Sequence, residues 1–185
     1  MAQRDKRRDR GDRFAREKGA VRKKWGGRIP VAVAFPNSYH VGMSNLAVHI
    51  LYRMLNARDN VVCERFFYEE GAPLVSVESS RPLSSFALIF FTLSFELDYP
   101  NIVKMLEQSF LPVPAGDRGD GSPLVVAGGV CVMANPEPVA PFFDLMVAGD
   151  IEATLPEFMD RFVASYRSGR EKTLAGLDSF PFVYR

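Results

Sequence analysis

Residues 29–42, IPVAVAFPNSYHVG, decide the fold of this chain. The first seven residues form a continuous apolar run, which is typical of a strand covered on both faces of a parallel sheet. A polar turn follows and a helical pattern then begins, so the stretch predicts a first strand-loop-helix unit. In α/β folds ligands gather where a strand gives way to the loop before a helix, and this loop is therefore the first place to look for a site.

The same unit recurs along the chain. Further apolar runs predict strands, and segments with helical spacing of apolar residues predict helices between and after them. The expected strands cover residues 29–35, 61–67, 87–93, 124–127 and 144–148, and the expected helices cover residues 46–56, 99–110 and 154–166. This alternation predicts an α/β fold, a flavodoxin-like doubly wound five-stranded parallel sheet in the order 2-1-3-4-5 with helices on both faces.

Composition and charge divide the 185 residues into three parts. Apolar residues make up 47% and charged residues 24%, an ordinary balance for a globular domain. Residues 1–28 hold 12 basic and 4 acidic side chains, a net of +8, whereas residues 29–185 hold 11 basic and 18 acidic ones, a net of −7. We expect residues 1–27 to be a basic mobile tail, residues 28–168 to be the α/β domain, and residues 169–185 to be a linker.

The basic tail allows two interpretations. It could attract nucleic acid or an acidic protein partner, because Lys and Arg dominate it. Asp5, Asp9 and Asp12 are interspersed and weaken its field. We therefore favour a solvated tail without a specific partner.

Cysteine use and hydropathy point to the compartment. Cys63 and Cys131 are too few for a disulfide framework, which predicts reduced thiols in a cytoplasmic protein. A pair of cysteines without further ligands does not hold an iron–sulfur cluster or a structural zinc. No apolar run approaches the ~18 to 20 residues of a membrane span, so no membrane partner is expected.

The candidate site gathers residues from three loops that follow predicted strands. The first loop offers an amide, a phenol and a glycine, the third strand ends in hydroxyl groups, and the fourth ends in a glycine pair that clears a wall for a bulky ligand. The candidate residues are Asn37, Tyr39, Gly42, Thr92, Ser94, Gly128 and Gly129. Because carboxyl ends of parallel strands meet at one edge of a sheet, these residues predict a cleft for a large ligand.

These motifs, in this order, resemble the cobalamin-binding Rossmann-like domain found at the N-terminus of many radical S-adenosylmethionine (radical SAM) enzymes. The resemblance is strongest to a little-characterised subgroup and covers roughly residues 28–167. The motifs that carry it are PNSYHVGMSNL at 36–46, FFTLSFELDYPN at 90–101, AGG at 127–129, NPEP at 135–138, Phe143 with Asp144, and GDIE at 149–152.

The resemblance implies a cofactor site that departs from the usual pattern. Cobalamin domains whose protein supplies the lower cobalt ligand carry D-x-H-x-x-G in the first loop, where the carboxylate orients the imidazole. At that spacing this chain has Asn37, Tyr39 and Gly42, and His40 comes one residue late. The resemblance therefore implies no histidine ligand to cobalt from this loop, with residues 92–94 approximating the S-x-L element that faces the nucleotide tail.

Two interpretations of the domain follow and both stay open. It binds cobalamin without a protein histidine ligand, or it keeps the fold as a docking or substrate-gating module. Radical SAM catalysis also needs a C-x-x-x-C-x-x-C motif for a [4Fe–4S] cluster that binds S-adenosylmethionine, and Cys63 and Cys131 do not have this spacing. We therefore expect an accessory, non-catalytic domain whose partner is a downstream radical SAM domain of the same protein.

Overall fold

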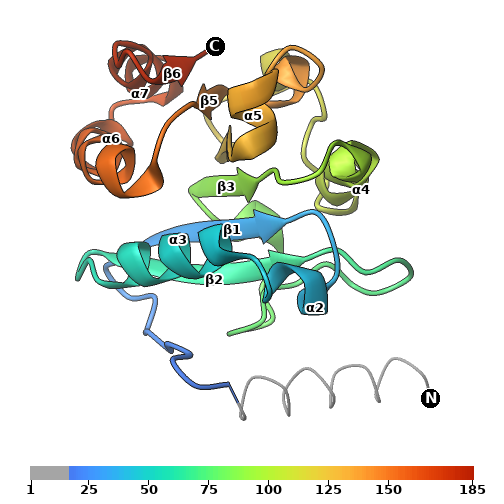
Figure 1. Ribbon diagram of the computed structural model, residues 1–185. Coiled ribbons are helices and arrows are strands. Elements are labelled where there is room, and N and C mark those ends of the chain that lie inside the picture. Colours follow the sequence, from blue (N-terminus) through green and yellow to red (C-terminus); the bar gives the residue numbers. More distant parts are fainter. Residues whose placement is uncertain (1–16) are drawn as a thin grey trace.

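The computed structural model describes residues 17–185, and these are organised around a six-stranded sheet in the order β2-β1-β3-β4-β5-β6 (Figure 1). The strands are β1 (Ile29–Phe35), β2 (Val61–Phe67), β3 (Leu88–Thr92), β4 (Leu124–Gly128), β5 (Leu145–Val147) and β6 (Val183–Tyr184). Strands β1 to β5 are parallel and follow the predicted order 2-1-3-4-5. The sheet differs from the five-stranded prediction by β6, which pairs antiparallel with β5.

Helices cover both faces of the sheet, as predicted. Alternate strand residues face opposite ways, so Val31 and Val33 join one core cluster, whereas Ala32 and Ala34 join the other. The helices are α2 (Tyr39–Gly42), α3 (Leu46–Asn56), α4 (Tyr99–Gln108), α5 (Val130–Ala134), α6 (Ile151–Ser165) and α7 (Arg170–Asp178). Buried residues of α3, α6 and α7 complete the first cluster, and buried residues of α4 and α5 complete the second.

In the described part of the chain, four single-turn 3-10 helices lie in the connections between strands and helices. They are η1 (Leu83–Ser85), η2 (Glu96–Asp98), η3 (Ala115–Asp117) and η4 (Ala140–Phe142). Within residues 17–185, no helix is long and apolar enough to cross a membrane.

The segment expected to be a linker, residues 169–185, is instead part of the domain. Helix α7 packs against α6, and Val183 in β6 lies opposite Val147 in β5. Leu174, Leu177 and Phe180 are buried in the core cluster on the α3 side of the sheet. The linker prediction failed because α7 has weak amphipathic spacing and β6 has only two residues, so the segment gains its order from tertiary packing.

A buried carboxylate fixes this C-terminal addition to the sheet. Asp144, which precedes β5, accepts a hydrogen bond of 2.7 Å from the backbone N–H of Val125 in β4. The same side chain pairs with Arg118 at 3.3 Å and with Arg170, the first residue of α7, at 2.5 Å. The Phe143-Asp144 motif is therefore structural in this domain, because Asp144 ties β4 to the start of α7.

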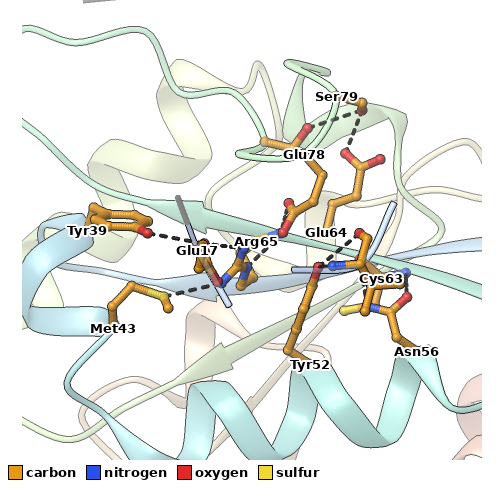
Figure 2. Close-up of polar contacts among 12 residues, drawn as sticks. Glu17, Tyr39, Met43, Tyr52, Asn56, Cys63, Glu64, Arg65, Glu78 and Ser79 are labelled. Atoms are coloured by element: carbon orange, nitrogen blue, oxygen red, sulfur yellow. Dashed lines mark hydrogen bonds and ion pairs between the residues drawn. The ribbon is translucent and has the colours of Figure 1, made fainter. Parts of the chain in front are cut away.

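The outer edge of β2 is closed by side chains instead of by another strand (Figure 2). The amide of Asn56 accepts from the backbone N–H of Cys63 and donates to the carbonyl oxygen of Cys63, both at 3.1 Å. The carboxylate of Glu78 accepts from the backbone N–H of Arg65 at 2.8 Å, and the N–H of Val77 donates to the Arg65 carbonyl at 2.9 Å. These contacts satisfy an edge that would otherwise offer unpaired groups to another chain.

The segment before β1 adds to this edge. Lys23 donates from Nζ to the carbonyl oxygens of Asn56, Arg58 and Val61, at 2.6, 2.9 and 3.1 Å. The indole N–H of Trp25 donates to Glu64 at 2.7 Å. The mobile tail was expected over residues 1–27; residues 1–16 lie outside the described part, whereas residues 17–27 contact the domain at these points.

Replacing Asn56 with Ala tests the closure of the edge. The substitution leaves a buried N–H and a buried C=O of Cys63 without their partners, so we expect the free energy of unfolding to fall by about 2 to 4 kcal/mol. Urea denaturation followed by circular dichroism measures this change. Asn60→Ala, at an exposed position just before β2, is the control and should change stability by less than about 0.5 kcal/mol. Equal losses in the two variants would contradict the closure.

Candidate functional site

A cleft of about 340 Å³ lies between α3 and α6, at the carboxyl ends of β3, β4 and β5. Its volume falls at the lower end of the range for small-molecule sites, ~300 to 1,000 Å³. The floor comes from strand ends, and the walls come from the first turns of α3 and α6. The lining residues are Leu46, Ala47, Ile50, Leu51, Phe90, Phe91, Thr92, Ala127, Gly128, Gly129, Val147, Gly149, Asp150, Ile151, Glu152, Thr154, Leu155 and Phe158.

Thr92 supplies the polar group on the floor of this cleft. The residue is only 3% exposed, and its hydroxyl oxygen has no hydrogen-bond partner within residues 17–185. A buried hydroxyl without a partner costs about 1 to 3 kcal/mol, so such groups are rare unless something else satisfies them. The arrangement suits a ligand that places one polar atom against Thr92 and apolar surface against the remaining walls.

The two glycines at the end of β4 have different roles. Gly129 has a φ of +116°, and a Cβ there would lie 2.5 Å from the carbonyl oxygen of Leu93, so its lack of a side chain lets β4 turn tightly against β3. Gly128 would bring a Cβ only within 3.5 Å of the Val147 carbonyl, an ordinary contact. Residue 128 shares the strand face of Val126, which looks toward α3 and α6, so Gly128 keeps the cleft open.

The charges at the cleft mouth restrict the kind of ligand. Helix α6 begins at Ile151, and the positive end of a helix dipole favours acceptor atoms. The exposed acidic residues Asp150 and Glu152 flank the same turn. Because these carboxylates repel an anion, the site suits a neutral, largely apolar group with a few polar atoms better than a phosphate.

The first loop does not reach the cleft. Asn37 donates from Nδ2 to Asp98 at 2.8 Å and accepts from the N–H of Ser38 at 2.7 Å. Burial raises the pKa of Asp98, which stands at the N-cap position of α4 without a capping hydrogen bond from its side chain. Ser94 accepts from Nδ2 of Asn45 at 2.8 Å and so ties the end of β3 to the start of α3. These residues shape the loops around the cleft without lining it.

Tyr39 and Gly42 also pack away from the cleft. The Tyr39 ring meets Phe67 edge-on at 5.2 Å, and its hydroxyl donates to Glu17 at 3.1 Å. A Cβ at Gly42 would lie 2.3 Å from the ring of Phe67, so this glycine lets α2 sit directly on β2. His40 is exposed. The structure therefore brings together Thr92, Gly128 and Gly129 of the candidate residues and separates them from Asn37, Tyr39 and Gly42.

One of the sequence motifs lines part of the cleft, although none of its residues was among the candidate site residues. Gly149, Asp150, Ile151 and Glu152 form its α6 wall, and they are the GDIE motif. Leu46 and Ile50 form the α3 wall. Their helical spacing suggested burial against the sheet, and only the positions of both helices show that they face a space.

Potential metal ligands do not gather in the described part of the chain. No group of three or more His, Cys, Asp and Glu residues within residues 17–185 is arranged to hold a metal ion. Cys63 and Cys131 are buried free thiols in different core clusters, on opposite faces of the sheet. Burial raises the pKa of both thiols above the ordinary value.

Exposed apolar side chains surround the same end of the sheet. Six of the eight large hydrophobic residues that are exposed within residues 17–185 follow the carboxyl ends of β1, β3 and β4. We call these six residues the apolar rim: Val41, Leu46, Phe95, Leu97, Val130 and Met133. Leu97 is 92% exposed, which is unusual for a leucine beside other exposed apolar groups.

The paired glycines give a direct test of how the floor is built. Gly129→Ala places a Cβ against backbone at a positive φ, so we expect a loss of about 3 kcal/mol or more in the free energy of unfolding. Gly128→Ala should cost about 1 kcal/mol or less, because its Cβ would make only an ordinary contact with the Val147 carbonyl oxygen. Urea titrations of both variants measure the difference, and a Gly128 variant as unstable as the Gly129 variant would refute this assignment.

Comparison with known proteins shows to which family the chain belongs. A family model described as radical SAM proteins, N-terminal, matches residues 47–185. An uncharacterised protein of Methanocaldococcus jannaschii is 32% identical over 124 residues, which are 67% of this chain and 24% of that protein. The chain thus spans about a quarter of the length of this curated relative. No solved structure gives a significant match. The chain belongs to the family of N-terminal domains of radical SAM proteins.

Proposed function

We propose that this accessory domain holds the nucleotide tail of a corrinoid in the cleft between α3 and α6, beside a downstream radical SAM domain. The observation that carries the proposal is the Thr92 hydroxyl, which is buried on the floor of an apolar cleft and has no hydrogen-bond partner among the described residues 17–185. The base of that tail with its sugar is a largely apolar, neutral group with a few polar atoms. The phosphate that joins the sugar to the corrin side chain is an anion, and it would lie outside the cleft, away from Asp150 and Glu152. Bound cobalamin would supply cobalt chemistry, such as methyl-group transfer, to the catalytic domain.

The residues of the cleft fit such a tail. Thr92 would hydrogen-bond one polar atom, and Gly128 leaves room for a flat ring against the end of β4. Leu46, Leu155 and Phe158 would supply apolar walls. A buried hydroxyl that gains a partner and apolar walls that lose contact with water both favour binding.

The cobalt itself would receive no protein ligand from the first loop. Tyr39 occupies the position of the usual histidine, and its hydroxyl already donates to Glu17. The His40 side chain is exposed on α2, which packs on β2. We therefore expect the residues of this loop to provide no ligand to the cobalt of a bound corrinoid.

Titration with hydroxocobalamin tests the proposal. The absorption spectrum should shift on binding with a Kd on the order of micromolar or below. Gly128→Val fills the cleft and should weaken binding by at least about tenfold, whereas Gly116→Val, at an exposed glycine with open space around it, should not change binding. Thr92→Val should weaken binding while leaving the domain folded.

Spectroscopy of the bound cofactor tests whether the protein provides a nitrogen ligand to the cobalt. The electron paramagnetic resonance spectrum of bound cob(II)alamin should be unaffected by isotopic labelling of the protein's nitrogen atoms. Absence of any spectral shift or heat of binding well above micromolar cofactor would overturn the corrinoid proposal.

The apolar rim favours docking as a second candidate function. Exposed apolar side chains that gather on one part of a surface mark interaction sites, and the rim residues follow strand ends at the end of the sheet where the cleft opens. A radical SAM domain carried on the same protein is the partner that family membership implies. In this alternative the domain needs no cofactor and shapes the entrance to the catalytic domain.

Substitutions in the full-length protein test whether the apolar rim contacts another domain or is simply exposed to solvent. Leu97→Asp should weaken interdomain contact and increase amide hydrogen exchange in Val130–Ala134, because it places a charge in the rim. Phe110→Asp is the control, since Phe110 is 95% exposed but follows the far end of α4. Equal exchange in both variants and the unaltered protein would rule out docking through this rim.

Nucleic-acid binding by the basic segment gains no support from the described residues. Within residues 17–27, the ammonium group of Lys23 donates hydrogen bonds to three carbonyl oxygens of the domain. Glu17 adds a negative charge to this segment and pairs with Arg65. Residues 1–16, which carry most of the basic charge, lie outside the described part.

A further inference from the structure

Arg65 is a buried cation, and the two terminal nitrogens of its guanidinium point toward Glu17, which lies before the first strand (Figure 2). It lies on β2, is 1% exposed, and its guanidinium stacks on the Tyr52 ring at 4.3 Å. Its Nε donates to Glu78 at 2.7 Å, so one carboxylate from the following connection already balances its charge. A guanidinium stays charged in proteins, and its remaining N–H groups need acceptors when buried.

Glu17 provides those acceptors from outside the α/β core. Its two carboxylate oxygens accept from both terminal nitrogens of Arg65, the second at 3.0 Å. The Tyr39 hydroxyl donates to the same carboxylate at 3.1 Å, and the Met43 sulfur lies 3.3 Å from the Arg65 fork. The resulting pocket binds a carboxylate bidentately, which is the geometry that gives arginine its selectivity for planar anions.

The carboxylate of Glu17 is not needed to attach its segment. Val21 is held by Tyr52, whose hydroxyl accepts from the Val21 N–H at 2.9 Å and donates to its carbonyl at 3.0 Å. Lys23 and Trp25 add the contacts described above. Between Glu17 and these anchors Lys18 and Gly19 are exposed, and Gly19 has a φ of +85°. Glu17 can therefore swing away while residues 21–25 stay in place.

We propose that Arg65 and Tyr39 form a carboxylate-binding site, occupied by Glu17 in cis and open to a small-molecule carboxylate that displaces it. The pair of Arg65 and Glu78 is neutral, so one further carboxylate brings the buried cluster to −1, as Glu17 does. A phosphate dianion would bring it to −2 close to Glu78, and that repulsion makes a monocarboxylate the better ligand. The site would couple the ligand to α2, which carries Tyr39.

Propionate tests the site, because its three carbons, of which one is the carboxylate carbon, match the Cβ, Cγ and Cδ atoms of a glutamate side chain. In Glu17→Ala, propionate should shift the NMR signals of Arg65 Nε–H and the Tyr39 ring at constant ionic strength. Its apparent Kd should be at least about tenfold lower than in the unaltered chain, where the tethered carboxylate competes at millimolar effective concentration. Saturating propionate should also speed amide exchange at residues 18–20 of the unaltered chain.

A second substitution and two other anions test the role of Tyr39 and the selectivity of the site. Adding Tyr39→Phe to the Glu17→Ala chain removes one donor but keeps the ring on Phe67, and it should weaken propionate binding by about tenfold or more. Equal propionate affinity with and without Glu17, or no loss in the Tyr39 variant, would overturn the site. Phosphate or chloride binding as tightly as propionate would overturn its selectivity for carboxylates.

Discussion

The burial of one guanidinium, that of Arg65, constrains how the domain is assembled. A guanidinium stays charged when it is buried, so it is stable there only beside carboxylates and an aromatic ring. The residues around Arg65 come from four separate segments of the chain. Glu17 comes from before the first strand, Tyr39 and Met43 from the loop after β1, Tyr52 from α3, and Glu78 from the connection that follows β2. Burial alone would lower the pKa of Arg65, but the hydrogen bonds and charges of Glu17 and Glu78 raise it above its ordinary value.

Side chains and a short strand also complete the two sides of the parallel sheet. Side chains of Asn56 and Glu78 satisfy the outer edge of β2, and β6 covers the other edge, where Asp144 anchors the start of α7. Helices cover both faces, so the features that we propose for ligand and partner binding lie at the carboxyl ends of the strands. The cleft and the apolar rim both lie there.

Sequence patterns predicted the parallel strands well because apolar runs such as residues 29–35 and 88–92 record burial on two faces. They also predicted that Thr92, Gly128 and Gly129 would meet at one edge, since strand ends in a parallel sheet are brought together by topology alone. The orientation of Tyr39 was beyond such patterns. It depends on Phe67 and on Glu17, residues 28 and 22 positions away, and no local periodicity encodes contacts of that kind. β6 was missed for a similar reason, since two residues gain strand structure only from β5.

A crystal structure of the chain grown with hydroxocobalamin tests the central claim most directly. We expect electron density for the nucleotide tail between α3 and α6, with one of its polar atoms within hydrogen-bond distance of the Thr92 hydroxyl and no atom of Tyr39 or His40 bound to cobalt. An empty cleft in crystals that contain the cofactor elsewhere, or cobalt bound by Tyr39 or His40, would contradict it.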